Sequence, residues 1–251
     1  MLEIDWTHEF ASIGSFSQNA LVAETFAGVI WPSFSRPALF ICNDGNKYVV
    51  KGAQVGRGII NEQIVASLGQ LIDAPIPTVR IIDIPKELRD AEPNLAYMQH
   101  GLSHGIAFQE NCSDRRWGAN QLFENIERYA SIVVLYNWIP SNDNQLIFRL
   151  SPPEIVYSVD HGHFFFGGPN WTTASLDLSG SVYWTTPRTR FPISISDVEI
   201  AIRRLNAVSP NDIARAIARL PAEWGMTAEE NVKLATYLER RRIQLLALPV
   251  Q

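Results

Sequence analysis

The feature that most constrains the fold of this chain is the segment ALFICNDGNKYVVK at residues 38–51. Two apolar runs rich in β-prone residues flank Asn43-Asp44-Gly45-Asn46, and the Asp-Gly step favours the positive φ angles of a hairpin turn. The segment therefore predicts two antiparallel strands, the second of which ends at Lys51. A single lysine on a strand is most often a solvated edge residue. Lys51 therefore indicates a functional site only in combination with residues that come after it in the chain.

The rest of the first part of the chain predicts one helix and further strands. Asn61 has the side chain of an N-cap, and the apolar residues of NEQIVASLGQLI, at 61–72, recur at helical spacing. Residues 76–85, IPTVRIIDIP, contain prolines at both ends and predict a strand, and GIAFQEN at 105–111 predicts a shorter one. This part is therefore rich in strands.

The second part of the chain favours helices. Residues 120–138 have the length and periodicity of a helix with a strongly apolar second half, which indicates burial. Two short β-like runs come next, QLIFRL at 145–150 and EIVYSVD at 154–160. Capping signals at Ser209, which precedes a proline, and at Thr227, in a Thr-x-x-Glu capping box, predict two more helices.

This order of elements predicts an α+β chain in two lobes. We place a strand-rich N-lobe with one helix at residues 1–110 and a mainly helical C-lobe at residues 111–251. A chain of 251 residues is long enough for two such lobes around a cleft.

Composition narrows the classes of partner. The formal net charge of −5 and the pI of about 5.6 give no basic field that would attract nucleic acid. No apolar run reaches the roughly 18 residues of a membrane span, and MLEIDWTHEF lacks the basic start and apolar core of a signal peptide. We therefore expect a cytoplasmic protein that binds neither nucleic acid nor a membrane directly.

Five charged or amide residues occur at four places along the chain in an informative order. Lys51 ends the hairpin, Glu62 lies in the first turn of the next predicted helix, Asp143-Asn144 come after the buried helix, and Asp160 ends an apolar run. Phosphoryl transfer uses a strand lysine on the nucleotide phosphates and a helix carboxylate that orients it. It also uses an Asp near the acceptor hydroxyl, with amide and carboxylate ligands for Mg²⁺. The ordered set therefore predicts a kinase-like site that binds ATP and Mg²⁺, in which Asp143 is catalytic and Asp160 and Asn144 bind the metal.

Several segments resemble the HipA-like kinase family. They are the lysine hairpin within SRPALFICNDGNKYVVKG, the loop VLYNWIPSNDNQLIF and the metal-binding segment YSVDHGHFFFGGPNW, and the similarity runs from about residue 25 to near the C-terminus. The resemblance implies a two-lobed protein-kinase-like fold and ATP-dependent phosphorylation of serine or threonine in a protein substrate. Some members of the family are toxins of toxin–antitoxin pairs, which implies an antitoxin-like protein as a partner.

The resemblance also assigns residues to the nucleotide. Lys51 would contact the ATP phosphates, Glu62 would be its helix partner, and Asp160 would be the main Mg²⁺ ligand. The hinge that holds the adenine would lie at Phe108, Gln109 and Glu110.

The predicted catalytic loop is shorter than those of related kinases, because Asn144 comes directly after Asp143. Adjacent side chains of an extended segment point in opposite directions, so both can face one metal only if the loop bends, and Asn142 is an alternative to either. Two functions therefore stay open. One is an active serine/threonine kinase, and the other is a catalytically weak kinase-like module that binds a nucleotide or a protein partner.

A zinc site is a further alternative. His161 and His163 form an H-x-H pair, which on a strand would present both rings to one face. No third ligand at a matching spacing is evident, and the plainer interpretation is that His161 packs in the core while His163 makes a local hydrogen bond.

Overall fold

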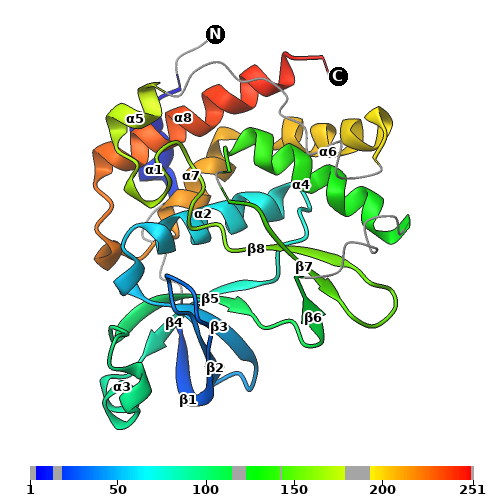
Figure 1. The fold of residues 1–251 in the computed structure, drawn as a ribbon. Coiled ribbons are helices and arrows are strands. Elements are labelled where there is room, and N and C mark those ends of the chain that lie inside the picture. Colours follow the sequence, from blue (N-terminus) through cyan, green and yellow to red (C-terminus); the bar gives the residue numbers. More distant parts are fainter. Residues whose placement is uncertain (1–3, 14–18, 115–122, 142, 179–192, 250–251) are drawn as a thin grey trace.

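The structure is a computed structural model that describes residues 4–13, 19–114, 123–141, 143–178 and 193–249. Five strands close into a barrel, which lies at the bottom of Figure 1, in the order β1-β2-β3-β5-β4. Their bounds are β1 Leu21–Ile30, β2 Ala38–Cys42, β3 Lys47–Lys51, β4 Val79–Ile84 and β5 Gly101–Ala107. All the pairings are antiparallel except the parallel contact between β1 and β4 that closes the barrel.

The predicted lysine hairpin is confirmed. β2 and β3 pair from Ala38 opposite Val50 to Ile41 opposite Lys47, and Gly45 in the turn has a φ of 78°. Lys51, the last residue of β3, lies opposite His104 of β5, so the lysine is held in the interior of a sheet and not at an edge. The strand expected at 105–111 in fact begins and ends about four residues earlier, as β5.

Helix α2, Gly58–Leu71, differs from the prediction at its start. The helix begins three residues before Asn61, so the assignment of Asn61 as N-cap is wrong. The apolar pair Ile59 and Ile60 extends the buried face of the helix backward, and all residues from Gly58 to Gly69 are buried. As a consequence Asn61 and Glu62 lie inside the helix, where both side chains point into a protein interior.

Above the barrel in Figure 1 lie α2 and, in the described part of the chain after it, four helices of nine or more residues. They are α4 Ile126–Trp138, α6 Ile195–Ala207, α7 Pro210–Ala218 and α8 Ala228–Leu246. The predicted caps are confirmed, because Ser209 and Thr227 each form a full capping box with the acid three residues on. Residues 120–122 of the expected 120–138 helix lie outside the described residues, and a 3₁₀ turn at Phe123–Asn125 precedes α4.

Short elements complete the fold. Helices α3 Lys86–Ala91 and α5 Thr173–Leu178 are single short segments. The first helix, α1 Trp6–Ile13, packs against α7 and α8, so the start of the chain lies with the helices and not with the barrel. The expected N-lobe of 1–110 therefore includes one segment, α1, that packs with the helices of the later part of the chain.

A small sheet, β6-β7-β8, lies between the barrel and the helices in Figure 1. Its strands are β6 Cys112–Ser113, β7 Gln145–Arg149 and β8 Val156–Val159. Pairing of Gln145 with Val159 brings the start of β7 next to the end of β8. The predicted two short runs are thus a hairpin that places Asp143 near Asp160.

Two separate hydrophobic clusters hold the molecule. One fills the barrel and includes Phe40, Val50 and Ile82. The larger cluster joins α2 to α4 and the later helices.

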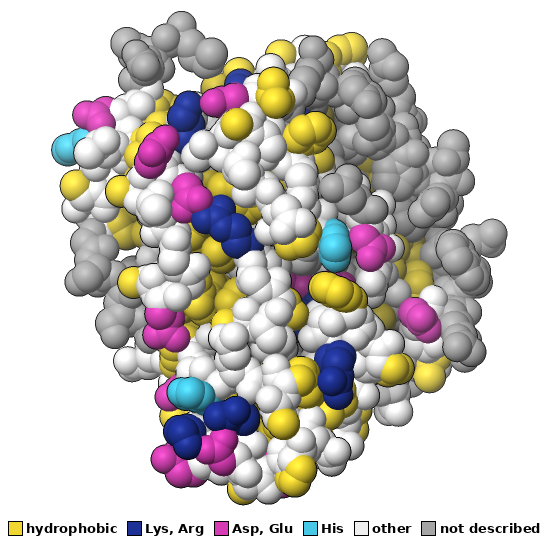
Figure 2. Space-filling view, turned by 60° about the vertical axis from the view of Figure 1, so that its left-hand side comes forward, with side chains coloured by type: hydrophobic (Ala, Val, Ile, Leu, Met, Phe, Trp, Pro, Cys, Tyr) yellow, Lys and Arg dark blue, Asp and Glu magenta, His cyan; other side chains and the backbone are white. Residues whose placement is uncertain are grey.

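No helix in the described part of the chain is both long and apolar enough to cross a membrane. On the face drawn in Figure 2, Lys and Arg side chains alternate with Asp and Glu and do not gather into a basic patch.

Candidate functional site

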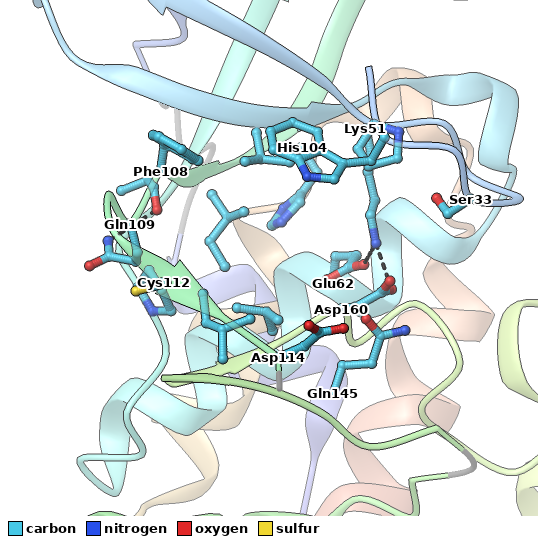
Figure 3. A pocket seen from close by; sticks show the side chains of 18 of the residues that line it. Ser33, Lys51, Glu62, His104, Phe108, Gln109, Cys112, Asp114, Gln145 and Asp160 are labelled. Carbon is cyan, nitrogen blue, oxygen red and sulfur yellow. Dashed lines mark hydrogen bonds and ion pairs between the residues drawn. The ribbon is translucent and has the colours of Figure 1, made fainter. Parts of the chain in front are cut away.

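A cavity of about 470 Å³ lies between the barrel and the small sheet (Figure 3). Its volume falls in the range of sites for small organic ligands, about 300–1,000 Å³. The barrel contributes apolar wall residues from β3 and β5, and the small sheet contributes Ile147 and Val159. The described residues that line it and carry polar groups are Ser33, Lys51, Glu62, His104, Gln109, Cys112, Ser113, Asp114, Gln145 and Asp160.

Lys51 joins the two carboxylates predicted to act with it. Its Nζ lies 2.5 Å from Oε1 of Glu62 and 2.6 Å from Oδ1 of Asp160. Burial on its own would lower the pKa of Lys51, but Glu62 and Asp160 outweigh that effect and raise it. Burial raises the pKa of Asp160, and the negative charge of Glu62 adds to this while Lys51 opposes it. One cation thus faces two anions, which leaves the cluster with a net charge of about −1 when all three are ionised.

Glu62 connects helix α2 to the segment that carries Asp160. Its second oxygen, Oε2, accepts a hydrogen bond of 2.8 Å from the backbone N–H of His161. Burial would raise the pKa of Glu62, but Lys51 and the nearby histidines outweigh it and hold the pKa well below its usual range. Asp160 has a φ of 59°, a strained conformation for a residue with a side chain, so Glu62 and Lys51 together hold a backbone that would otherwise relax.

His161 is buried, whereas His163 lies on the surface. The His161 ring is buried, its Nε2 lies 2.8 Å from Oγ of Ser158, and it packs edge-on against Phe164 at 5.0 Å. Burial lowers the pKa of His161 to about 4, so the ring is neutral. His163 is exposed. Among the described residues no group of three His, Cys, Asp or Glu side chains could hold a metal ion, and the H-x-H pair therefore does not form a zinc site there.

Asn61 is a structural residue that the cap interpretation missed. Its amide nitrogen lies 2.8 Å from the carbonyl of Gly162 and 3.1 Å from those of Phe164 and Gly168. Its oxygen accepts a hydrogen bond of 2.9 Å from the indole of Trp171. One buried side chain on α2 therefore fixes the whole turn that comes after Asp160. The only signal in the sequence is that Asn61 precedes Glu62.

Two of the three predicted hinge residues line the cavity, and the third does not. Phe108 and Gln109 line the cavity, and the Phe108 ring lies 6.2 Å from that of Trp31, which also lines it. Glu110 is not among the lining residues, and its carboxylate instead pairs with Lys47 at 2.8 Å on the surface. Trp31 gave no signal in the sequence, because its position beside Phe108 results from the closure of the barrel.

A second cavity of about 270 Å³ shares Lys51, Glu62, Gln145 and Asp160 with the first. Asp143 lines this second cavity, as do Ser35 and His163. Asp143, the predicted catalytic aspartate, therefore lies in a different cavity from Phe108 and Gln109, which line only the first.

The predicted metal ligand Asn144 does not line either cavity, whereas its neighbour Gln145 lines both. Asn142, the alternative ligand, lies outside the described residues. The missed residue Gln145 begins strand β7, and no pattern in the sequence distinguished it from its neighbour Asn144.

Comparison with known families gives a match. A model of the family described as HipA-like kinase matches residues 30–166, which is more than half of the chain and includes Lys51, Glu62, Asp143 and Asp160. Comparison with curated proteins gives no match.

Solved structures that are similar to this chain include two kinases. One is the Helicobacter pylori proinflammatory kinase CtkA, with a TM-score of 0.61 and 9% sequence identity over 90% of this chain and 95% of that one. The other is the Golgi casein kinase with Mn and ADP bound, with a TM-score of 0.45 and 12% identity over 96% of this chain and 75% of that one. The first shows a shared, kinase-like fold, whereas the second is too distant in shape to add to it.

Proposed function

Because the chain belongs to the HipA-like kinase family, we propose that it is an ATP- and Mg²⁺-dependent protein kinase that phosphorylates serine or threonine. The observation that carries the proposal is the contact of buried Lys51 with buried Glu62 and half-buried Asp160 at the wall of a cavity large enough for a nucleotide. In this proposal the barrel and the helical part are the two lobes, and the nucleotide lies between them.

The shape of the cavity supports a place for each part of ATP. Trp31 and Phe108 lie at one end beside Val49 and Ile106, where a flat adenine ring would be enclosed by apolar side chains. Lys51 lies at the other end, so the phosphates would extend toward its ammonium group. Gln109 donates a hydrogen bond of 3.1 Å to the carbonyl of Ala107 and so steadies the hinge.

Mg²⁺ fits the charges at Asp160. The cluster has a net charge near −1, and Mg²⁺ typically takes one or two carboxylates and completes its shell with waters and phosphates. When bound, the ion would neutralise charge that develops on the phosphates during transfer. Asp160 would hold it, and the positive φ of Asp160 aims the carboxylate into both cavities.

Asp143 would act on the acceptor hydroxyl in the second cavity. The hydroxyl oxygen attacks the γ-phosphorus, the bond from that phosphorus to the β-phosphate oxygen breaks, and ADP leaves. The hydroxyl proton passes to the carboxylate of Asp143. A toxin role and an antitoxin-like partner are part of the proposal and rest on the family resemblance alone. A cytoplasmic location, the expectation from the sequence, is also part of the proposal.

Incubation with ATP labelled at the γ-phosphate, Mg²⁺ and a mixture of acceptor proteins tests the proposal. We expect label on the protein itself or on an acceptor, and a loss of about a hundredfold or more in Asp143→Ala. Asp90→Ala is the matched control, because Asp90 is an exposed acid on α3 paired with Lys86. Equal labelling by wild type and Asp143→Ala would remove the catalytic role of Asp143.

A second function is favoured by one feature of the catalytic loop. Gln145 donates a hydrogen bond of 3.3 Å to Oδ2 of Asp143, which engages one of the two oxygens that could accept the proton of a hydroxyl. The alternative is therefore a kinase-like module that binds nucleotide but transfers phosphate weakly. Stabilisation of the protein against heat by ATP and Mg²⁺, without any transfer of label, would support this alternative over the active kinase.

A further inference from the structure

The start of strand β7 presents three consecutive polar side chains, Asp143, Asn144 and Gln145, to different surroundings. Gln145 is already paired with Val159 of β8, so the chain is extended there. Asp143 lies at a bend two positions before Gln145, so the lining of the cavities, and not strand alternation, shows which way these side chains face. Asp143 lines the smaller cavity, Gln145 lines both, and Asn144 lines neither.

The carboxamide of Asn144 is used within its own turn. Its Oδ1 accepts a hydrogen bond from the hydroxyl of Ser141. The same hydroxyl lies 3.0 Å from the carbonyl of Asp143, and Ser141 is joined to Phe164 by a β-bridge. Asn144 thus stabilises the turn that leads into β7, and its oxygen is committed to that turn.

The carboxamide of Gln145 is oriented by Asp143. Its Nε2 donates the hydrogen bond to Oδ2 of Asp143, so the nitrogen is fixed and the oxygen becomes the atom left for a ligand. Figure 3 shows the Gln145 side chain beside Asp160 in the larger cavity. An amide oxygen and a carboxylate oxygen that face one space both carry negative partial charge, and a small hard cation is what such a pair binds.

We infer that Gln145, and not Asn144, supplies the amide oxygen that holds the divalent cation together with Asp160. This inference rests on the proposed function, because it names a ligand within the same nucleotide site. In the inferred arrangement Asp143 keeps the catalytic role, and Gln145 takes the metal-binding role that the sequence assigned to Asn144. The short loop can then still offer both groups, because Gln145 and Asp143 line the same cavity.

The test measures metal-dependent nucleotide affinity and needs no turnover. Calorimetric titration with an ATP analogue whose β–γ bridge is nitrogen is performed once with Mg²⁺ and once with EDTA, for wild type, Gln145→Ala and Asn144→Ala. We expect Mg²⁺ to tighten binding to wild type and to Asn144→Ala alike. In Gln145→Ala the increase in affinity that Mg²⁺ causes should be smaller by about tenfold or more, while the affinity in EDTA stays as in wild type.

Gln145→Glu provides the rescue, because a carboxylate restores an oxygen at the same reach and should restore the gain from Mg²⁺. Electron paramagnetic resonance of Mn²⁺ with the analogue gives a second readout, in which Gln145→Ala should leave more Mn²⁺ free than Asn144→Ala. Gln145 is exposed, so the two Gln145 variants should unfold at the same temperature as wild type in EDTA.

Each other outcome overturns one specific statement. A lost gain in Asn144→Ala, or an unchanged gain in Gln145→Ala, would overturn the role of Gln145 while the nucleotide site stands. An analogue that binds wild type equally well with Mg²⁺ and with EDTA would overturn the metal part of the proposed function. No binding to wild type under either condition would overturn the proposed function itself, and the inference with it.

Discussion

Lys51 is a buried lysine whose position depends on two acids from distant parts of the chain. A lysine that is 8% exposed would be costly without partners, and here Glu62 comes from α2 and Asp160 from the end of β8. Glu62 is the more deeply buried of the two acids and also accepts the backbone N–H of His161. Removal of Glu62 should therefore affect stability as well as the nucleotide site.

We expect Glu62→Ala to lower the free energy of unfolding by about 3 kcal/mol. This value is at the lower end of the range of about 3–5 kcal/mol that is typical of breaking a buried ion pair, because Lys51 keeps Asp160 as a partner. Urea denaturation measures it. Glu110→Ala is the matched control, since Glu110 also pairs with a lysine but on the surface, and it should leave both stability and nucleotide affinity nearly unchanged. A loss in Glu110→Ala as large as in Glu62→Ala would contradict this account of burial.

Two neutral histidines behind Lys51 predict how stability varies with pH. Burial lowers the pKa of His104 and of His161 from 6.5 to about 4. Between these values the unfolded chain binds protons that the folded protein does not, so the free energy of unfolding is highest above pH 6.5 and falls as the pH drops toward 4. The contribution is on the order of 3 kcal/mol for each ring.

Urea denaturation at a series of pH values between 7.5 and 4.5 measures this dependence. In His104→Gln the slope of stability against pH should decrease, because one of the two rings is gone while Gln63 keeps a hydrogen-bonding neighbour. His8→Gln is the control, as His8 is exposed on α1. A slope that is the same in His104→Gln as in wild type would mean that His104 is not the group that titrates.

At the scale of elements, the loop between β1 and β2 covers the cavities without a glycine-rich sequence. Ser33 lines both cavities, and Phe34 and Ser35 line the smaller one. Tyr97 holds the loop through Arg36 in two ways. Its hydroxyl donates a hydrogen bond of 2.6 Å to the Arg36 carbonyl, and its ring lies 3.9 Å from the Arg36 guanidinium carbon. Arg36 itself has a φ of 43°, so Tyr97 stabilises a strained loop.

Tyr97→Phe should weaken binding of ATP by about fivefold, the value of one hydrogen bond, because the loop would be less ordered over the phosphates. Binding of AMP, which lacks the β- and γ-phosphates, should stay the same. Competition titrations with both nucleotides measure the ratio. Tyr157→Phe is the matched control, since that ring also lies near an arginine, Arg128, but in the small sheet. Equal weakening of AMP and ATP in Tyr97→Phe would point to a general loss of structure.

The elements that could be predicted from the sequence are those specified by local signals. The Asp-Gly turn of the lysine hairpin and the capping boxes at Ser209 and Thr227 act within a few residues, and the structure confirms all three. The predicted start of α2 was wrong because Asn61 has the side chain of a cap but makes its hydrogen bonds to residues about a hundred positions away. No local pattern contains that information.

At the scale of the whole molecule, the site is a product of how the barrel, α2 and the small sheet meet. The order of Lys51, Glu62, Asp143 and Asp160 along the chain indicated a common site, and the structure brings Lys51, Glu62 and Asp160 into contact, with Asp143 on the wall of the adjoining cavity. The order could not show which of two adjacent amides faces the cavity, nor that Glu110 points away from it. Those facts depend on strand register and on the closure of the barrel.

The boundary between the two parts also depends on packing that spans the chain. α1 joins α7 and α8, and α2 contributes to the larger hydrophobic cluster although its neighbours in sequence belong to the barrel. The part of the chain before residue 110 therefore contains the five barrel strands, whereas α1 and α2 pack with the helices that come later in the chain.

The measurement that tests the central claim most directly is the Mg²⁺ dependence of nucleotide binding in Asp160→Asn, monitored by calorimetry. Asn tolerates a positive φ, so the variant keeps the backbone of Asp160 while it removes the charge. We predict that Mg²⁺ no longer tightens binding of the ATP analogue by more than a small factor, while affinity in EDTA is equal to wild type or better. A wild-type response to Mg²⁺ in Asp160→Asn would contradict the assignment of Asp160 as the metal anchor beside Lys51.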